Sequence, residues 1–537
     1  MRRYTKGYRH GDGTALAVAV PTSLTALWRV VEACVRNNAA IIVQAANTGL
    51  TGGSTPDGDG YDRPVVIVST LELRTIRLLN EGREVLCHAG ATLHSLEASL
   101  APLGREPHSV IGSSCIGASV VGGVCNNSGG ALVQRGPAYT DYALFARVNE
   151  EGVLELVNKL GIDLGDGDPV TMLARLDCGA ITASPEPVPG RSGSAPDYET
   201  RVRAIDAATP ARYNADPAHL RDASGCAGKL VVFAVRLDSF PKPKQAKVFY
   251  IGSNDPDELT ELRRAALGSF EMLPIAAEYM HRSAFDIADC YGRDMFHAIR
   301  ILGAARLPRL FAVKDAFARI GAGCGMTLGF EERLLQAVGR LLPDPLPARL
   351  REWRARYEHH LMVRCAGSAA EELGDWLANN FPSKTGDWFL CDQEEGEAAF
   401  LHRFVAAGAA IRYEAVHRRE TGGLVALDIA LRRDDRSWFE TLPPEIEARI
   451  AARLYYGHFF CHVLHQDYLL VKGSDAAAFK REMLRVLDTR GAMYPAEHNV
   501  GHAYHANKTL SRFYRDLDPT NMLNPGIGKM SKARNYA

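Results

Sequence analysis

Histidines crowd the C-terminal third of this 537-residue chain. Seven of its 17 histidines lie between residues 417 and 505, at positions 417, 458, 462, 465, 498, 502 and 505. Clustered imidazoles are typical of metal sites and of proton transfer near neutral pH. Glu497 directly precedes His498 and adds a carboxylate. We therefore expect His458, His465 and Glu497 to be candidate ligands of a catalytic zinc or manganese ion with one open position.

The spacing of the two candidate histidine ligands limits this hypothesis. His458 and His465 are seven residues apart, in a segment (455–471) whose composition is typical of a strand. On one straight strand an odd spacing points two side chains to opposite faces. They converge only if the chain turns or bulges between them, or if the segment is helical. The alternative is that these histidines are core or surface residues satisfied by ordinary hydrogen bonds.

Two glycine-rich segments in the N-terminal third form a second candidate site. Residues 46–60 contain five glycines and residues 111–136 contain seven. Glycine lets a backbone approach a ligand closely, and successive backbone N–H groups can bind an anion such as a pyrophosphate. Neither segment reads G-x-G-x-x-G, so a Rossmann dinucleotide site is disfavoured. The alternative is a pair of tight loops that only pack strands together.

The pattern of apolar residues places these segments among alternating strands and helices. Helical spacing predicts a helix over 21–37, and buried strands are expected at 40–44, 65–69 and 230–237. A proline- and lysine-containing segment near residue 240 indicates a domain boundary. Further along, strands are expected at 411–415 and 423–431, and a helix at 480–491.

Residues 281–357 differ in charge from the rest of the chain. They contain 13 Arg and Lys against 8 Asp and Glu, a net charge of +5 in a chain whose total is −1. Arg300, Arg306 and Arg309 are interleaved with apolar residues such as Leu310 and Phe311. Basic side chains beside apolar ones suit an anionic membrane surface. A solvated helical face is the equally weighted alternative.

Composition excludes several classes of protein. A net charge near zero argues against a chain-wide nucleic-acid binder. The chain has 11 cysteines, an odd number, and no C-x-x-C motif. This pattern favours a reducing compartment over a disulfide framework or a zinc ribbon. No signal peptide is recognisable, and no apolar run approaches the 18 residues or so of a spanning helix. Any membrane contact is therefore expected to be peripheral.

Four motifs together carry a resemblance to a known family. Residues 45–55 (AANTGLTGGST) and 109–130 resemble the two flavin loops of the vanillyl-alcohol-oxidase superfamily. Residues 496–501 (AEHNVG) and 517–526 (LDPTNMLNPG) resemble motifs of its D-2-hydroxyacid dehydrogenase branch. Longer stretches, such as QAANTGLTGGSTPDGD and YPAEHNVGH, resemble the respiratory, quinone-linked D-lactate dehydrogenases of bacteria.

The resemblance implies an α+β fold of three parts. Residues 1–240 plus 510–537 would form a bipartite FAD-binding domain of the vanillyl-alcohol-oxidase and PCMH type. Residues 241–280 plus 358–509 would form a cap domain with an antiparallel sheet over the substrate. Residues 281–357 would form a helical, basic insertion that docks on the membrane.

The resemblance also assigns roles to individual residues. It implies FAD contacts at a set of positions in and near the glycine-rich segments. These are Ala46, Asn47, Thr48, Gly49, Leu50, Gly53, Ser54, Thr55, Ser113, Gly117, Val120, Gly123, Gly130 and Val232. His498 aligns with the general base, and His458, His465 and Glu497 align with metal ligands. The family's H-x-G-D-G-N-x-H turn is altered here, because Phe460, Cys461 and His462 replace G-D-G.

The expected reaction follows from these parts. The flavin would accept a hydride from C2 of D-lactate, His498 would take the hydroxyl proton, and electrons would pass to a membrane quinone. Arg412 and Arg418, with Arg419 beside them, are candidates to bind the substrate carboxylate. The expected location is the cytoplasmic face of the inner membrane, on anionic lipid. The rival interpretations are a soluble D-2-hydroxyglutarate or glycolate dehydrogenase with a protein electron acceptor, and a membrane-anchored flavoprotein without catalysis.

Overall fold

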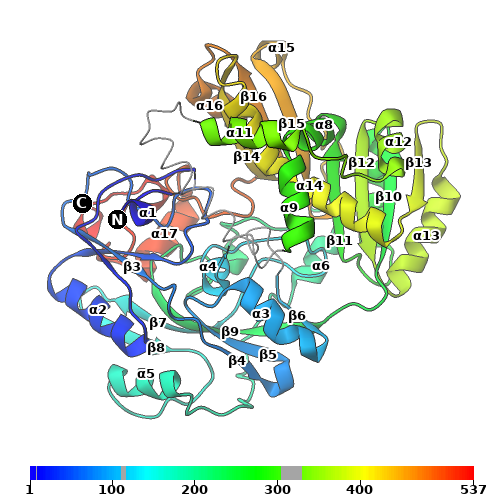
Figure 1. The fold of residues 1–537 in the computed structure, drawn as a ribbon. Coiled ribbons are helices and arrows are strands. Elements are labelled where there is room, and N and C mark those ends of the chain that lie inside the picture. Colours follow the sequence, from blue (N-terminus) through cyan, green and yellow to red (C-terminus); the bar gives the residue numbers. More distant parts are fainter. Residues whose placement is uncertain (8, 110–116, 304–328) are drawn as a thin grey trace.

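The structure, a computed structural model, describes residues 1–537 except 8, 110–116 and 304–328. The N-terminal and C-terminal parts of the chain lie together in one lobe, and the middle of the chain forms a second lobe beside it (Figure 1). Both termini lie in the first lobe, where red and blue segments are adjacent. Segments far apart in the sequence are thus neighbours there.

A small parallel sheet begins the first lobe. Its strands, in the order β1-β3-β2, are Ala17–Ala19, Val65–Ser69 and Ala40–Gln44. The preceding helices are α1 (Arg2–Thr5) and α2 (Leu24–Arg36). Ser23 accepts a hydrogen bond from the backbone of Ala26 and so starts α2, close to the expected position. The C-terminal tail extends this sheet, since Ile41 donates to the carbonyl of Met522 at 2.9 Å.

A larger antiparallel sheet completes the first lobe. Its main path is β4 (Ile76–Leu79), β5 (Glu84–His88), β9 (Val231–Pro241), β7 (Tyr142–Val148) and β8 (Leu154–Asn158), and β6 (Arg105–Pro107) pairs with β9. The associated helices are α3 (Leu93–Leu100), α4 (Val120–Cys125), α5 (Pro169–Cys178) and α6 (Tyr198–Arg203). The buried strand expected at 230–237 is β9, at the centre of this sheet.

The second lobe is built on a seven-stranded antiparallel sheet in the order β13-β10-β12-β11-β15-β16-β14. In chain order its strands are β10 (Lys247–Ser253), β11 (Ala276–His281), β12 (His359–Cys365), β13 (Gly386–Leu390), β14 (Thr421–Ala430), β15 (Ile450–His458) and β16 (Val463–Val471). The later helices are α7 (Pro256–Gly268), α13 (Ser368–Asn380), α14 (Gln393–Val416), α15 (Pro444–Glu447), α16 (Ala476–Thr489) and α17 (Lys508–Leu517).

Two expectations about this lobe are wrong. The strand expected at 411–415 is the last part of α14, which begins at a capping box formed by Asp392 and Glu395. A short apolar run cannot by itself distinguish a strand from a helix segment, and here the alanine-rich run before it favours the helix. The segment 455–471 is not one strand, because it contains the end of β15, a turn and β16.

The basic segment 281–357 is helical in its described part. It contains α8 (Arg282–Tyr291), α9 (Arg293–Leu302), α11 (Phe330–Gly339) and α12 (Ala348–Arg356). α8 packs against α14, with Phe285 buried, so the first helix of the segment belongs to the core of the second lobe. Arg306, Arg309, Leu310 and Phe311 lie outside the described residues.

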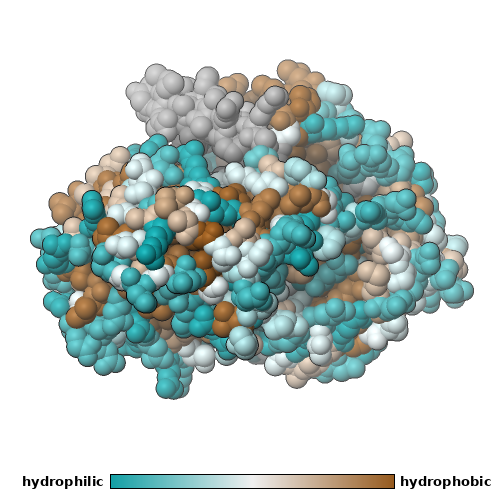
Figure 2. Space-filling view, turned by 90° about the horizontal axis from the view of Figure 1, so that it is seen from below, coloured by the Kyte–Doolittle hydropathy of each residue, from teal (hydrophilic) through white to brown (hydrophobic). Residues whose placement is uncertain are grey.

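Hydrophilic residues form most of the rim of the face shown in Figure 2, and hydrophobic residues gather toward its middle. Such mixing is ordinary for folded proteins, whose exposed area is largely apolar. None of the helices in the described part of the chain combines the length and apolar character needed to cross a bilayer.

Candidate functional site

Strand pairing in the second lobe brings four ionisable side chains to one face of the sheet. Glu278 on β11 is paired with His458 on β15, and Asp428 on β14 is paired with His465 on β16. β15 and β16 pair so that His458 is opposite Val463 and Tyr456 is opposite His465. Directly opposed residues share a face, as do residues two apart. All four side chains therefore lie on the same side of adjacent strands.

A tight turn between β15 and β16 explains how two histidines seven residues apart converge. Residues 459–461 form one turn of 3₁₀ helix, and His462 then adopts a left-handed conformation with φ of 53°. Histidine tolerates this region better than most residues that carry a Cβ. Nδ1 of His462 also donates to the carbonyl of Arg432 at 2.8 Å. The turn at 459–462, where this sequence lacks glycine, thus reverses the chain between the two histidines.

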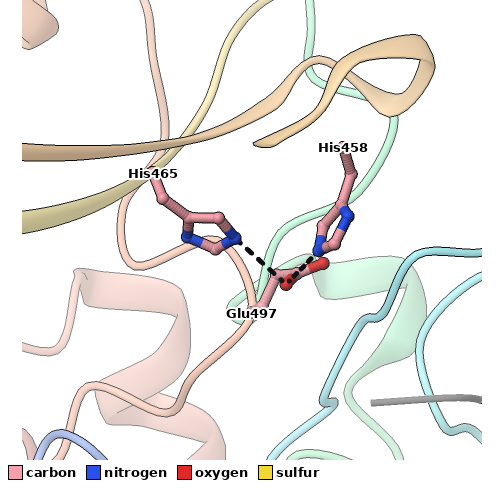
Figure 3. A group of neighbouring side chains, drawn as sticks. All are labelled: His458, His465 and Glu497. Atoms are coloured by element: carbon pink, nitrogen blue, oxygen red, sulfur yellow. Dashed lines mark hydrogen bonds and ion pairs between the residues drawn. The ribbon is translucent and has the colours of Figure 1, made fainter. Parts of the chain in front are cut away.

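Glu497 joins these strands from the loop that follows α16. Its Oε2 accepts from Nε2 of His458 at 3.1 Å and lies 3.9 Å from Nε2 of His465 (Figure 3). The nearest ligand atoms of the three residues all lie within 4.8 Å of one another. The structure therefore brings together all three residues that the sequence predicted as metal ligands.

The other oxygen of Glu497 is held by the first lobe. Oε1 accepts from Nη2 of the buried Arg212 at 2.7 Å and from the backbone of Gly130 at 3.0 Å. A Cβ at Gly129 would lie only 2.3 Å from this oxygen, so the position requires glycine. The second glycine-rich segment therefore orients Glu497, which leaves Oε2 directed at the histidines.

Charges within the cluster compensate one another. Burial opposes protonation of His458, but the carboxylates of Glu278 and Glu497 outweigh it and raise its pKa to about 9. Its Nδ1 donates to Glu278 at 2.5 Å. Burial, together with the positive charges of Arg403 and His458, holds the pKa of His465 well below its ordinary value. His458 thus carries a proton between two carboxylates, while His465 is neutral and able to bind a cation.

The predicted general base lies at the edge of this cluster. His498 follows Glu497, and its side chain is 31% exposed, whereas its neighbours are buried. Its Nε2 is 3.8 Å from Oδ2 of Asp428, and the same Oδ2 accepts from the backbone of Glu497 at 2.8 Å. Asp428 therefore connects the loop that carries His498 to β14, the strand on which Asp428 itself lies. Sequence analysis did not select Asp428, and only its pairing opposite His465 reveals it.

The structure places the candidate arginines away from this cluster. Arg412 is buried, with Nε 2.9 Å from Glu332 and with a further ion pair to Asp294. Arg418 and Arg419 are exposed beyond the end of α14.

A different arginine of α14, Arg403, lies against the site. Its Nε is 2.6 Å from Oε2 of Glu278, and its Nη2 is buried without a hydrogen-bond partner. Nine residues separate Arg403 from Arg412, about two and a half helical turns, so the two face opposite sides of α14. If residues 393–416 had been recognised as one helix, its period would have placed Arg403 and Arg412 on opposite faces.

The two glycine-rich segments meet beside the cluster. A Cβ added at Gly117 would lie 4.0 Å from that of Ala46, so the segments face each other, whereas Gly49 has open space on its side. A Cβ at Gly53 would contact Asn499, the residue after His498. The backbone of these loops is not covered by side chains at Gly49, so it could approach an extended cofactor that contains a diphosphate. Among the other candidate contacts, Val120 begins α4, Val232 lies in β9, and Ser113 is outside the described residues.

The remaining candidate contacts are distributed along the same loops. Asn47 accepts from Ser54 at 2.9 Å, and Thr55 is fully buried. Thr48 and Leu50 are partly buried on either side of Gly49, and Gly123 lies buried within α4.

Comparison with protein families gives two matches along the chain. Residues 15–150 match a family described as an FAD binding domain, and residues 248–536 match one described as D-lactate dehydrogenase, membrane binding. The first match contains the loop at 46–60 and the second contains the His458, His465 and Glu497 cluster. FAD is therefore the cofactor of this protein.

Solved structures share the fold at low sequence identity. An alkyldihydroxyacetonephosphate synthase matches with a TM-score of 0.56 and 11% identity, over 97% of this chain and 80% of that chain. p-Cresol methylhydroxylase matches with a TM-score of 0.53 and 11% identity, over 98% of this chain and 92% of that chain. The expected vanillyl-alcohol-oxidase and PCMH type of α+β fold is confirmed.

Sequence relatives extend over nearly the whole chain. The quinone-dependent D-lactate dehydrogenase of Escherichia coli (strain K12) is 56% identical over 99% of this chain and 94% of its own length. That of Haemophilus influenzae is 52% identical over 99% of this chain and 95% of its own length. This chain belongs to the family of FAD-containing, quinone-dependent D-lactate dehydrogenases.

Proposed function

We propose that this protein oxidises D-lactate to pyruvate where the flavin loops meet the cluster of the second lobe, and that a membrane quinone takes the electrons. One observation carries the proposal: Glu497 is bonded to the second flavin loop through Gly130 and to His458 in the cap sheet. A substrate beside His498 would therefore lie next to the second loop, and Asn499, the residue after His498, accepts a hydrogen bond from Thr51 of the first loop. When bound, the flavin supplies the acceptor for the hydride from C2 of the substrate.

His498 has the position of a general base. It is partly exposed, so a bound substrate can reach it, and the neutral imidazole can accept the 2-hydroxyl proton. Asp428, 3.8 Å from Nε2, lies where it stabilises the imidazolium that results. The proton thus moves to a group whose new charge is balanced by a neighbouring carboxylate.

His458, His465 and Glu497 would hold a divalent zinc or manganese ion. Two imidazoles and one carboxylate leave an open position, as in catalytic zinc sites. Glu278, bonded to Nδ1 of His458, would orient that ligand in the way that carboxylates usually support metal-bound histidines. The ion would take the place of the proton that His458 now carries, and it would lower the pKa of the substrate hydroxyl.

We assign the substrate carboxylate to Arg403 in place of Arg412 or Arg418. Arg412 is occupied by two carboxylates and Arg418 is exposed, whereas Nη2 of Arg403 is buried and without a partner. A guanidinium can bind a carboxylate through two parallel hydrogen bonds, which fixes the orientation of the substrate. Arg403 reaches the cluster from α14, so it would hold the end of the substrate that faces the cap.

FAD is expected to contact the backbone of the loop at 46–55 and of the segment that contains Gly117 and Val120. Gly49→Val should yield protein without flavin, because its side chain would enter the open space where the diphosphate must lie. The measurement is the ratio of flavin absorbance at 450 nm to protein after purification. Gly60→Val, on an exposed glycine later in the same segment, is the control and should remain yellow. A full flavin complement in Gly49→Val would refute this placement.

The basic segment 281–357 would dock the protein on anionic lipid at the cytoplasmic face of the inner membrane. Besides its arginines, the segment exposes Leu334 and Val338 of α11 and Leu341 just after it, which are 43%, 47% and 86% exposed. They recur at helical spacing, as an apolar stripe. Arg300 is only 2.6 Å from Glu394, so part of its charge is already neutralised. Docking would therefore combine attraction by arginines with shallow insertion of this stripe.

Vesicle sedimentation tests this docking surface. Wild-type protein should sediment with vesicles containing about 30% anionic lipid at low salt, and less as salt screens the attraction. Replacement of Arg300, Arg306 and Arg309 by Glu should weaken sedimentation at low salt. Replacement of Leu334, Val338 and Leu341 by Asn should remove the fraction that resists salt. Leu16→Asn, an exposed leucine of the first lobe, is the control. If neither set of changes alters sedimentation, the segment is not the docking surface.

Anaerobic titration tests the reaction itself. D-Lactate should bleach the flavin absorbance in the absence of any acceptor, and L-lactate should not. D-2-Hydroxyglutarate and glycolate should act far more weakly. Faster bleaching by either of these would favour the alternative of a soluble dehydrogenase with a protein acceptor. No bleaching by any 2-hydroxy acid would contradict the proposed function.

A further inference from the structure

Tyr456 of β15 lies beside two residues of the proposed site without being one of its ligands. It is paired with His465 of β16, and the centres of the two rings are 5.4 Å apart. The guanidinium of Arg403 lies over the same tyrosine ring, with Cζ 4.9 Å from the ring centre. One aromatic side chain therefore lies against both a proposed metal ligand and the proposed carboxylate ligand.

The Tyr456 ring is held at both of its ends. Its hydroxyl donates to Oδ2 of Asp467 at 2.8 Å, and both residues are only 3% exposed. Its backbone lies in a strand at the interior of the sheet, where it pairs with Met280 on one side and with His465 on the other. A buried carboxylate that lost its hydrogen-bond donor would be costly, so Asp467 keeps the phenol in one orientation. The ring is thus a rigid surface.

Two contacts fix the guanidinium of Arg403 against this surface. Oε2 of Glu278 is 2.6 Å from Nε, and the Tyr456 ring covers one face of the group. A cation over an aromatic face is attracted by the ring quadrupole, and more strongly where water is excluded. Nη2 is buried and has no hydrogen-bond partner. The guanidinium is therefore held in place while one of its donors stays available to a ligand.

Prior fixation of this group favours binding of a carboxylate. Arginine has a long, flexible side chain, and the rotamer freedom it loses on binding a ligand weakens that binding. A guanidinium that is already held has less freedom to lose. It also keeps a constant position relative to His465, because both lie against the same ring.

We infer that Tyr456 is a positioning residue for the substrate carboxylate: its ring, anchored by Asp467, holds the guanidinium of Arg403 in place beside His465. The inference rests on the proposed function, which assigns the carboxylate to Arg403. Tyr456 acts through Arg403 and does not itself bind the substrate. Its loss should therefore weaken binding of D-lactate much more than it slows the reaction of bound D-lactate.

Anaerobic flavin reduction of the holoenzyme at increasing D-lactate concentrations separates these effects, because it gives an apparent Kd and a limiting rate. Tyr456→Leu should raise the apparent Kd by about 10- to 30-fold, as expected for loss of a desolvated cation–π contact. Its limiting rate should fall by less than about threefold. Tyr456→Phe keeps the aromatic face and should stay within about threefold of the wild-type Kd. A Kd in Tyr456→Phe as high as in Arg403→Gln would show that the ring does not hold Arg403, even if Tyr456→Leu fails to fold.

A double-mutant cycle shows whether Tyr456 acts through Arg403. Arg403→Gln alone should also raise the apparent Kd. The Kd of Tyr456→Leu/Arg403→Gln should be close to that of Arg403→Gln, because the ring then has no guanidinium left to position. If the two fold-increases multiply in the double variant, the residues act independently and the inference is overturned.

Tyr455→Leu is the matched control. Tyr455 is also 3% exposed, donates to the buried Glu440 at 2.7 Å and lies under Arg453, whose Cζ is 5.8 Å from the ring centre. As the neighbour of Tyr456 in the same strand, it faces the other side of the sheet. Its loss should disturb packing in a similar way and leave the Kd unchanged. A rise as large as that of Tyr456→Leu would reflect a general loss of packing and overturn the inference.

Metal content and the single arginine variant distinguish this inference from other failures. Tyr456→Leu should contain as much metal as wild type, and a loss of metal would assign the ring to His465 instead of Arg403 and overturn the inference. A wild-type Kd in Arg403→Gln would refute the assignment of the carboxylate, and this inference with it. Failure of the proposed reaction is a different result, since D-lactate would then fail to bleach even the wild-type flavin.

Discussion

His498→Ala protein should retain its flavin and yet be reduced by D-lactate at least a hundred-fold more slowly than wild type. Loss of a general base usually lowers the rate by about 10²- to 10⁴-fold, or about 3–5 kcal/mol in the barrier. The flavin loops do not depend on this imidazole, because the hydrogen bonds described between these loops and the segment around it go to Glu497, Asn499 and His502. The measurement is the rate of flavin bleaching in anaerobic stopped flow.

His505→Ala provides the control for this experiment. His505 belongs to the same histidine-rich segment but is exposed and lies seven residues beyond His498. It should be reduced at the wild-type rate. Reduction of His498→Ala at near wild-type speed would move the base elsewhere. His465 would then be the next candidate, ahead of His417, which is bonded to Tyr291 and Glu420 at the end of α14.

The second large effect concerns the proposed metal ion. Purified wild-type protein should contain about one zinc or manganese ion per chain, and His465→Ala should contain almost none. Its flavin reduction should fall by about 10²-fold or more, since the ion would activate the substrate hydroxyl. Metal content is measured by elemental analysis and reduction by stopped flow. Incubation with a chelator should reproduce the loss in wild-type protein, and returning the ion should reverse it.

His462→Asn is the control for His465→Ala. It shows whether metal content depends on the proposed ligands in particular or on any histidine of this segment. His462 lies within the same turn, but its Nδ1 bonds the backbone of Arg432 and it is not among the three clustered ligands. Asparagine also tolerates a positive φ, so the turn should be preserved. Metal content should therefore stay near the wild-type value. Wild-type protein that is fully active and free of metal would refute the proposed ion and leave the cluster as a hydrogen-bonded network around Glu497.

The sequence by itself determined the local features of this protein. The many glycines at 46–60 and 111–136 indicated loops with accessible backbone, because glycine has no side chain to cover it. The apolar period of 21–37 and the buried runs at 65–69 and 230–237 predicted α2, β3 and β9. The motif around Glu497 and His498 carried the family resemblance, which the relatives then confirmed.

Only the tertiary structure decided how these parts combine into a site. The spacing of His458 and His465 predicted opposite faces for a straight strand, whereas the turn at 459–462 places them on one face of a hairpin. Asp428 and Arg403 carry no motif, and they join the site through strand pairing and through the face that α14 presents. Arg412 has the same chemistry as Arg403 but faces the opposite side of the helix. Contacts between residues hundreds of positions apart depend on register and packing, which local composition does not encode.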